Sequence, residues 1–116
     1  MRITETTRLR AVWIPHACGE VLEVVIGSGL NLPFYSRNVQ RIYGVHPSVE
    51  LQRIARKRTV AKPIKIEFLS QSAEEPLPLP NTSIHTVVVT GHYVPHVKRV
   101  LKMSGRLIFV EHGRAP

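Results

Sequence analysis

Short runs of mostly apolar, β-branched residues recur along the chain and alternate with turns and helix-forming segments. Runs of this length and composition predict strands. The predicted strands are residues 20–26, 41–45, 64–69, 84–90 and 106–111. Because apolar residues fill these runs almost continuously, we expect a parallel sheet that is covered on both faces.

Helix signals lie between some of these strands. Residues 47–57 begin with a proline at an early helical position and carry apolar residues at helical spacing, which predicts a helix. A second helix is predicted over roughly residues 92–103, with Pro95 in its first turn and Gly105 just beyond its end. Residues 75–80 are rich in proline and predict an extended connector.

The length of 116 residues leaves room for one sheet with its covering helices, so we expect a single domain over residues 1–116. The lone cysteine, Cys18, excludes an internal disulfide and is typical of a reducing compartment. No apolar run approaches the roughly 20 residues of a membrane span. The first residues also lack the pattern of a secretory signal, and a cytoplasmic protein with no membrane partner is expected.

The first predicted strand runs into Gly27-Ser28-Gly29. A glycine-rich turn after a strand exposes backbone N–H groups and lets a nucleotide-like ligand approach closely. The full dinucleotide-binding pattern has a third glycine, whereas Val25 stands two residues before Gly27 here. A glycine turn with no ligand explains the loop equally well, so the loop alone does not decide the function.

Longer motifs around this loop resemble the class I S-adenosylmethionine-dependent methyltransferases, most closely their type 11, ubiquinone-biosynthesis-like branch. The similar segments are residues 19–35, 43–48, 72–80, 100–107 and 109–113. They follow one another in the family's order and at similar spacing, over about residues 10–116.

The resemblance implies an α/β, Rossmann-like fold with a parallel sheet of about five strands in the order 3-2-1-4-5, helices on both faces, and without the family's last strands. It implies S-adenosylmethionine as the cofactor, lying across the carboxyl ends of strands 1, 2 and 4. Glu23 would face its methionine end, and an acid after strand 2 holds the ribose in the family. The implied cofactor-binding residues are Glu23, Gly27, Ser28, Gly29, His46, Ala73, Glu74 and Thr90.

Some positions near this site depart from the family pattern. The family usually has Gly at 25 and Asp at 46 and 85, whereas this chain has Val25, His46 and His85 and contains no aspartate at all. A carboxylate accepts hydrogen bonds from both ribose hydroxyls, but a neutral imidazole offers one donor and one acceptor. We therefore expect His46 to weaken cofactor binding by about 1–3 kcal/mol.

Several residues have a second interpretation. His46 could instead act as a general base, and Glu74 could be an exposed connector residue. His85 is expected to be structural, because the family acid there lies at the start of strand 4. His92 and His96 are four residues apart, but Pro95 lies between them and no carboxylate accompanies them, so no metal site is expected. No catalytic base is identifiable.

The short connection between strands 4 and 5 and the positive net charge predict two kinds of binding partner, a second copy of the chain and nucleic acid. The connection between strands 4 and 5 is shorter than in the family, and strand 5 is predicted to be an uncovered edge, which favours a homodimer or swapped assembly. The formal net charge is +8, and nonspecific attraction to nucleic acid follows from charge alone. The basic cluster behind this idea is Arg53, Arg56, Lys57, Arg58, Lys62 and Lys65.

The leading hypothesis is an S-adenosylmethionine-dependent methyltransferase that acts on an unidentified acceptor. The alternative is a non-catalytic, cut-down relative with the same fold. Such a relative would act by self-association, or by binding a partner or nucleic acid through its basic face.

Overall fold

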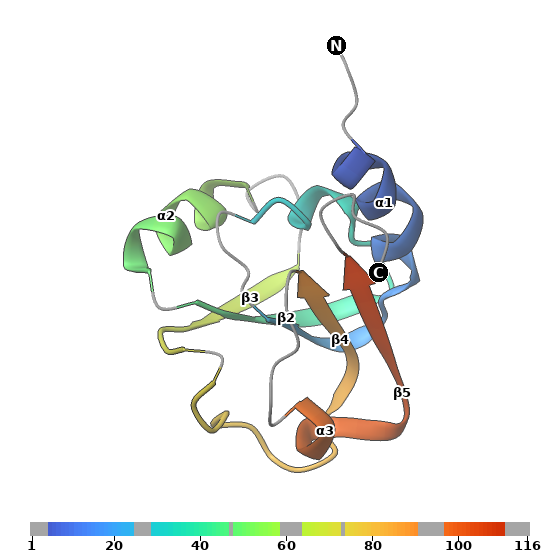
Figure 1. The fold of residues 1–116 in the computed structure, drawn as a ribbon, viewed down its shortest axis with the longest axis vertical. Coiled ribbons are helices and arrows are strands. Elements are labelled where there is room, and N and C mark those ends of the chain that lie inside the picture. Colours follow the sequence, from blue (N-terminus) through green and yellow to red (C-terminus); the bar gives the residue numbers. More distant parts are fainter. Residues whose placement is uncertain are drawn as a thin grey trace.

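A computed structural model describes residues 5–24, 29–46, 48–58, 64–72, 74–90 and 97–110 of the chain. They form a central sheet with short helices packed against it (Figure 1). In chain order the elements are α1 (Glu5–Trp13), the 3-10 helix η1 (Ile14–His16), β1 (Gly19–Val24), the 3-10 helix η2 (Leu32–Phe34), β2 (Val39–Val45), α2 (Val49–Arg58), β3 (Lys65–Leu69), β4 (Ile84–Thr90), α3 (Val97–Val100) and β5 (Leu101–Val110). No helix in these ranges is long and apolar enough to cross a membrane.

The sheet has five strands in the order β3-β2-β1-β4-β5, and every neighbouring pair is parallel. This confirms the predicted fold class. The strand order reverses at β1, which lies in the centre between β2 and β4. In open parallel sheets, ligands bind outside the carboxyl ends of the strands at such a reversal.

Each face of the sheet has its own apolar core, because successive side chains of a strand point to opposite faces. On one face Val21 packs with Ile14, Ile42 and Ala55, beneath η1 and α2. On the other face Leu22 packs with residues of the 75–80 connector and of α3. The sheet is therefore covered on both faces, as its continuous apolar strands predicted.

The second predicted helix is wrong over its last part. α3 ends at Val100 and β5 begins at Leu101, while residues 92–96 lie outside the described part of the chain. Between two successive pairings with β4, at Leu101 and at Arg106, β4 advances by two residues and β5 by five. This bulge takes up residues 102–105, so the pairing with β4 overrides the local helical pattern there.

Gly105 lies within this bulged part of β5 rather than at a helix end. A Cβ at this position would lie 2.8 Å from the Lys102 carbonyl oxygen and 3.0 Å from the His85 carbonyl oxygen. The glycine therefore permits the close approach of β5 to β4. This contact between distant segments could not be predicted from the helical spacing of residues 92–103.

Helix α1 was not predicted. Its mean hydropathy is low, so no clear apolar pattern marks it in the sequence. It contacts β5, at the opposite end of the chain, and runs through η1 toward β1 (Figure 1). Packing against β5 thus stabilises a helix that its own sequence does not predict.

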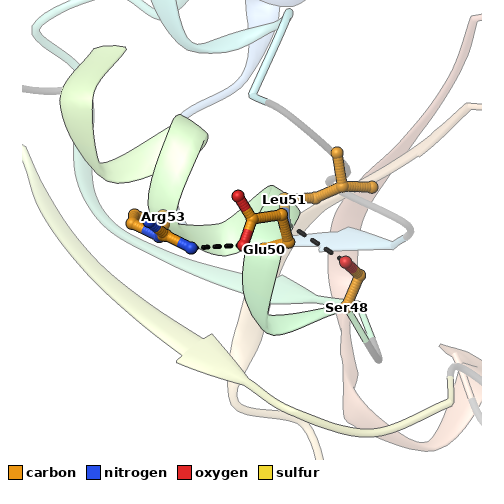
Figure 2. Close-up of polar contacts among 4 residues, drawn as sticks. All are labelled: Ser48, Glu50, Leu51 and Arg53. Carbon is orange, nitrogen blue, oxygen red and sulfur yellow. Dashed lines mark hydrogen bonds and ion pairs between the residues drawn. The ribbon is translucent and has the colours of Figure 1, made fainter.

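Helix α2 confirms the predicted helix over residues 47–57, although Pro47 lies outside the described residues. The Ser48 hydroxyl accepts the Leu51 N–H at 3.2 Å and so caps the first turn. Glu50 and Arg53 form an ion pair on the exposed side of the helix (Figure 2). Exposed pairs of this kind contribute little to stability, so the serine cap is the stronger local signal.

The start of β1 is held against β4 by side chains of two neighbouring residues. The buried Thr86 hydroxyl accepts the Cys18 N–H at 3.1 Å and donates to the Cys18 carbonyl at 3.0 Å. Next to it, His85 Nδ1 accepts the Glu20 N–H at 3.0 Å. A Cβ on Gly19 would lie 2.5 Å from that same nitrogen, so a glycine is needed here. His85 therefore has the structural role that was expected of it.

We predict that Thr86→Val lowers the free energy of unfolding by about 1–3 kcal/mol, because an isosteric methyl leaves the half-buried Cys18 N–H and carbonyl without their partner. Urea denaturation measures the loss. Thr86→Ser, which keeps the hydroxyl, is the control and should lose less than Thr86→Val. Equal stability of Thr86→Val and the wild type would contradict this role of the hydroxyl.

Candidate functional site

The centre of the sheet contains a buried carboxylate. Glu23 lies near the carboxyl end of β1, pairs with Gly44 on β2 and Val88 on β4, and is only 1% exposed. The neighbouring side chains of β1, Val21, Leu22 and Val24, are fully buried and apolar. Burying a carboxylate among them is unfavourable unless other groups compensate for its lost hydration.

The compensation comes from the segment that follows β1. The Tyr35 hydroxyl donates to Glu23 Oε1 at 2.6 Å, and the Asn31 side chain also hydrogen-bonds to the carboxylate. Burial raises the pKa of Glu23 to about 7, because the hydrogen bonds from Tyr35 and Asn31 and the charge of Arg10 only partly oppose desolvation. Burial, together with the charge of Glu23, raises the pKa of Tyr35 well above its usual value.

Arg10 of α1 completes this group. It is 7% exposed, and its Nε donates to Asn31 Oδ1 at 2.8 Å. Asn31 thus bridges the guanidinium and the carboxylate. We call Arg10, Glu23, Asn31 and Tyr35 the buried polar cluster; it joins α1, β1 and the segment around η2. Sequence reasoning assigned a role only to Glu23. Asn31 and Tyr35 lie inside the glycine-loop motif, but nothing in the sequence linked Arg10 to it.

Gly29 lies beside this cluster and requires the absence of a side chain. Its φ is +82°, which favours glycine, and a Cβ would lie 2.6 Å from Leu32 Cδ1 and 3.0 Å from Ala55 Cβ. The chain therefore passes close to α2 immediately after β1. Gly27 and Ser28, the other predicted residues of the loop, lie outside the described residues.

His46 follows the last residue of β2, and its hydrogen bonds define its chemistry. Its Nδ1 accepts the Ser48 N–H at 3.0 Å, and its carbonyl oxygen accepts from Gln52 Nε2 at 3.1 Å. With Nδ1 occupied, the neutral ring carries its proton on Nε2 and presents a donor. The Nδ1 lone pair is therefore engaged by the backbone, and the general-base alternative stays a prediction.

Gln52 is a residue that sequence reasoning missed. It is 3% exposed, and besides the His46 carbonyl its Nε2 donates to the Ser70 hydroxyl at 2.9 Å. One amide thus connects the ends of β2 and β3 with the first turns of α2. The position of His46 is set by this connection, and a lone glutamine in a helix gave no sign of it.

The remaining predicted residues are less closely defined. Glu74 is exposed in the connector, and its backbone N–H donates to the Ser72 hydroxyl at 3.2 Å. Thr90 is the last residue of β4, and Ala73 lies outside the described residues. The structure thus brings Glu23 and Gly29 to the end of β1 and His46 to the end of β2. The binding roles of all these residues stay predictions.

The basic cluster is partly engaged by its own chain. Arg53 pairs with Glu50, and the Arg56 guanidinium lies 4.6 Å from the centre of the Phe68 ring. Lys57 and Lys65 are exposed, whereas Lys62 lies outside the described residues, as do His92 and His96.

We predict that Glu23 makes the protein less stable as pH rises. The pKa of Glu23 is about 7 in the folded state against 4.5 for an ordinary glutamate. Between these values the unfolded chain has released the proton that the folded protein keeps, so stability falls with rising pH. The difference corresponds to about 3 kcal/mol. Urea denaturation at pH 4.5 and pH 7.5 should show this loss in the wild type and not in Glu23→Gln.

Glu74→Gln removes an exposed carboxylate and serves as the control for this measurement. Its stability should fall between the two pH values as much as that of the wild type. A loss in Glu23→Gln equal to that of the wild type would show that Glu23 titrates normally.

Known proteins share this sheet and this sequence pattern. A family model described as a methyltransferase domain matches residues 21–108. A phosphatidylethanolamine N-methyltransferase of Cereibacter sphaeroides is 29% identical over 122 residues, covering 96% of this chain and 60% of the relative. The uncharacterised methyltransferase YcgJ of Bacillus subtilis is 29% identical over 103 residues, covering 79% of this chain and 40% of the relative.

Solved structures agree at the level of the fold. The crystal structure of YcgJ matches with a TM-score of 0.70 at 24% identity, over 90% of this chain and 48% of that one. A methyltransferase in complex with the Haloferax volcanii Trm112 activator matches with a TM-score of 0.69 at 23% identity, over 86% of this chain and 48% of that one.

The chain spans 60% and 40% of the length of the two curated relatives. The match of the family model to residues 21–108 confirms the resemblance at the level of the family, while the type 11 branch stays a prediction. The chain belongs to the methyltransferase domain family, which has the class I fold and takes S-adenosylmethionine as its cofactor.

Proposed function

We propose that this chain binds S-adenosylmethionine at the carboxyl ends of β1 and β2 and serves methyl transfer to an acceptor. The observation that carries the proposal is Glu23, a carboxylate 1% exposed in the central strand. An apolar side chain would serve the fold better at this position. A perturbed, buried acid at the point where the strand order reverses is typical of a ligand site.

The residues present fit this cofactor. The Glu23 carboxylate suits a cationic amino group, and Gly29 lets the chain after β1 pack closely against α2. Nε2 of His46 can donate to a ribose oxygen, while Gly27, Ser28, Ala73, Glu74 and Thr90 keep the roles that the family resemblance implies. When bound, S-adenosylmethionine supplies an electrophilic methyl group carried on a sulfonium.

The first test is isothermal titration of the wild type with S-adenosylmethionine and S-adenosylhomocysteine. We expect dissociation constants in the micromolar range, on the order of −8 kcal/mol. Absence of heat up to millimolar ligand, with the protein folded, would overturn the proposal and favour the non-catalytic alternative. Incubation with methyl-labelled cofactor and candidate amine and lipid headgroup acceptors then tests transfer itself.

The same titration tests His46 through two substitutions. His46→Asp should raise cofactor affinity about tenfold, because one carboxylate oxygen can accept the Ser48 N–H while the other accepts from a ribose hydroxyl. His46→Asn is the matched control, since it keeps one acceptor and one donor; its affinity should stay near that of the wild type. No gain in His46→Asp would place His46 away from the ribose.

We also propose that the chain self-associates through β5. Within the described part of the chain, β5 pairs with β4 on one side only. Met103 is fully exposed and Leu107 is 53% exposed. A groove of about 540 Å³ lies beside the strand and is lined by Trp13, His16, Arg106, Leu107 and Ile108. Exposed apolar side chains along a free strand edge favour pairing with a second copy.

Sedimentation at micromolar concentration should therefore give the mass of a dimer or larger assembly. Leu107→Lys should shift it toward the monomer, because a charge would be buried in the contact. Val49→Lys adds the same charge at an apolar residue of α2 that is 69% exposed, and it should leave the mass unchanged. A monomeric wild type would overturn the assembly.

A further inference from the structure

Helix α2 presents aliphatic side chains to solvent. Val49 is 69% exposed and Ile54 is 38% exposed. Leu30, in the turn where the chain passes close to α2, is 47% exposed. The inner side of the helix is occupied by the buried Gln52 and Ala55, so the core beneath it is filled without these three residues. Single exposed apolar residues are common on protein surfaces, but here they lie on one helix and the adjoining turn.

The same helix is strongly basic. It contains one acidic residue, Glu50, and four basic ones: Arg53, Arg56, Lys57 and Arg58. Glu50 pairs with Arg53, so the helix keeps a net positive charge (Figure 2). Arg56 and Lys57 are exposed, and the Arg56 guanidinium lies 4.6 Å from the centre of the Phe68 ring. This contact with β3 holds a cation beside the exposed apolar residues.

These apolar and basic residues form one surface, which we call the α2 face: Leu30, Val49, Arg53, Ile54, Arg56 and Lys57. A surface that combines cations with aliphatic side chains matches the interface of an anionic lipid bilayer. Each Lys or Arg near such a surface strengthens binding about fivefold. Aliphatic side chains enter the boundary between headgroups and acyl chains, while the long stems of Lys and Arg reach back to the phosphates.

The aliphatic residues distinguish this partner from nucleic acid. Nucleic acid attracts cations through its phosphates, and its bases stack on aromatic side chains. Branched aliphatic residues such as Val49 and Ile54 gain little from either contact. The combination on the α2 face therefore favours lipid over nucleic acid.

We propose that the α2 face binds the surface of bilayers that contain anionic lipids. The contact is peripheral, with α2 lying along the interface, and it departs from the expectation of a protein with no membrane partner. Because the inner side of the helix packs on the sheet, only its outer side reaches lipid, so binding depends on the charge of the membrane. The inference goes beyond the proposed function, since no step of it uses the cofactor.

The position of the α2 face is compatible with the other proposals. Figure 1 shows α2 and β5 on opposite sides of the molecule, so a bilayer at α2 leaves the proposed self-association surface accessible. Helix α2 begins at Val49, shortly after β2 ends at Val45. A bilayer on this face would therefore lie close to the carboxyl end of β2, where the cofactor site is proposed.

The test is co-sedimentation of the wild type with sucrose-loaded vesicles. One set contains phosphatidylcholine alone, and the other contains about one-third phosphatidylglycerol. We expect binding to be at least about tenfold tighter for the anionic set, because more than one cation reaches the surface. Raising the ionic strength from about 0.1 M to about 0.5 M should weaken this binding at least about fivefold, since salt screens exposed charges.

A first pair of variants tests the charge. Lys57→Gln should weaken binding to the anionic vesicles about fivefold. Lys65→Gln removes the same charge from an exposed residue of β3 and is the matched control. Its neighbours Ile66 and Phe68 pack against the core beneath α2, so Lys65 points to the other face of the sheet. Its binding should equal that of the wild type.

A second pair tests the aliphatic contact. Val49→Ser should weaken binding to the anionic vesicles about three- to fivefold, and it should leave binding to duplex DNA unchanged. Val12→Ser makes a similar change at a residue of α1 that is 57% exposed, on the side of the sheet next to β5, and should bind vesicles like the wild type. Circular dichroism establishes that each variant is folded.

Each contrary result has a distinct meaning. Absence of vesicle binding, or equal binding to both kinds of vesicle, overturns the proposal. A loss in Lys57→Gln without a loss in Val49→Ser, together with tight binding to duplex DNA, would show a surface for polyanions in general and would also overturn it. Equal losses in Val49→Ser and Val12→Ser would place the contact outside the α2 face. None of these results bears on the proposed function, because the vesicle experiment contains no cofactor.

Discussion

The burial of the Glu23 carboxylate in the central strand is the constraint on which the rest of the structure depends. Removing a carboxylate from water is strongly unfavourable, so its neighbours must supply polar contacts. Tyr35 and Asn31 supply them from the segment after β1, and Arg10 adds its charge from α1. The path of the chain on this face of the sheet follows from that requirement.

Strand β1 is consequently held at both ends by polar contacts and along its length by apolar ones. Thr86 and His85 secure its start against β4, and the buried polar cluster surrounds its end. Apolar packing is non-directional and tolerates small shifts, whereas hydrogen bonds of this kind require a set register. Such rigidity suits the ligand site that we propose at the end of this strand, because a binding site depends on positions held within fractions of an ångström.

The far edge of the sheet is built differently. β5 joins β4 through a bulge, and two of its large apolar side chains, Met103 and Leu107, are exposed. The chain thus combines a tightly specified centre with an edge that presents apolar surface. The proposed cofactor site and the proposed self-association surface lie at different parts of one sheet, so substitutions can test them separately.

The sequence by itself predicted most of the strands and helix α2, because apolar periodicity and helix signals are local. The family resemblance predicted the strand order and placed Glu23, Gly29 and His46 at the ends of the first two strands. Tertiary structure alone decided that Arg10 meets Asn31 across 21 residues, that Ser48 occupies Nδ1 of His46, and that residues 101–103 join β5 rather than a helix. These outcomes depend on contacts between segments that only the folded sheet brings together. The free energy of burying a charge or of pairing a strand depends on these tertiary contacts, so local sequence preference does not predict it.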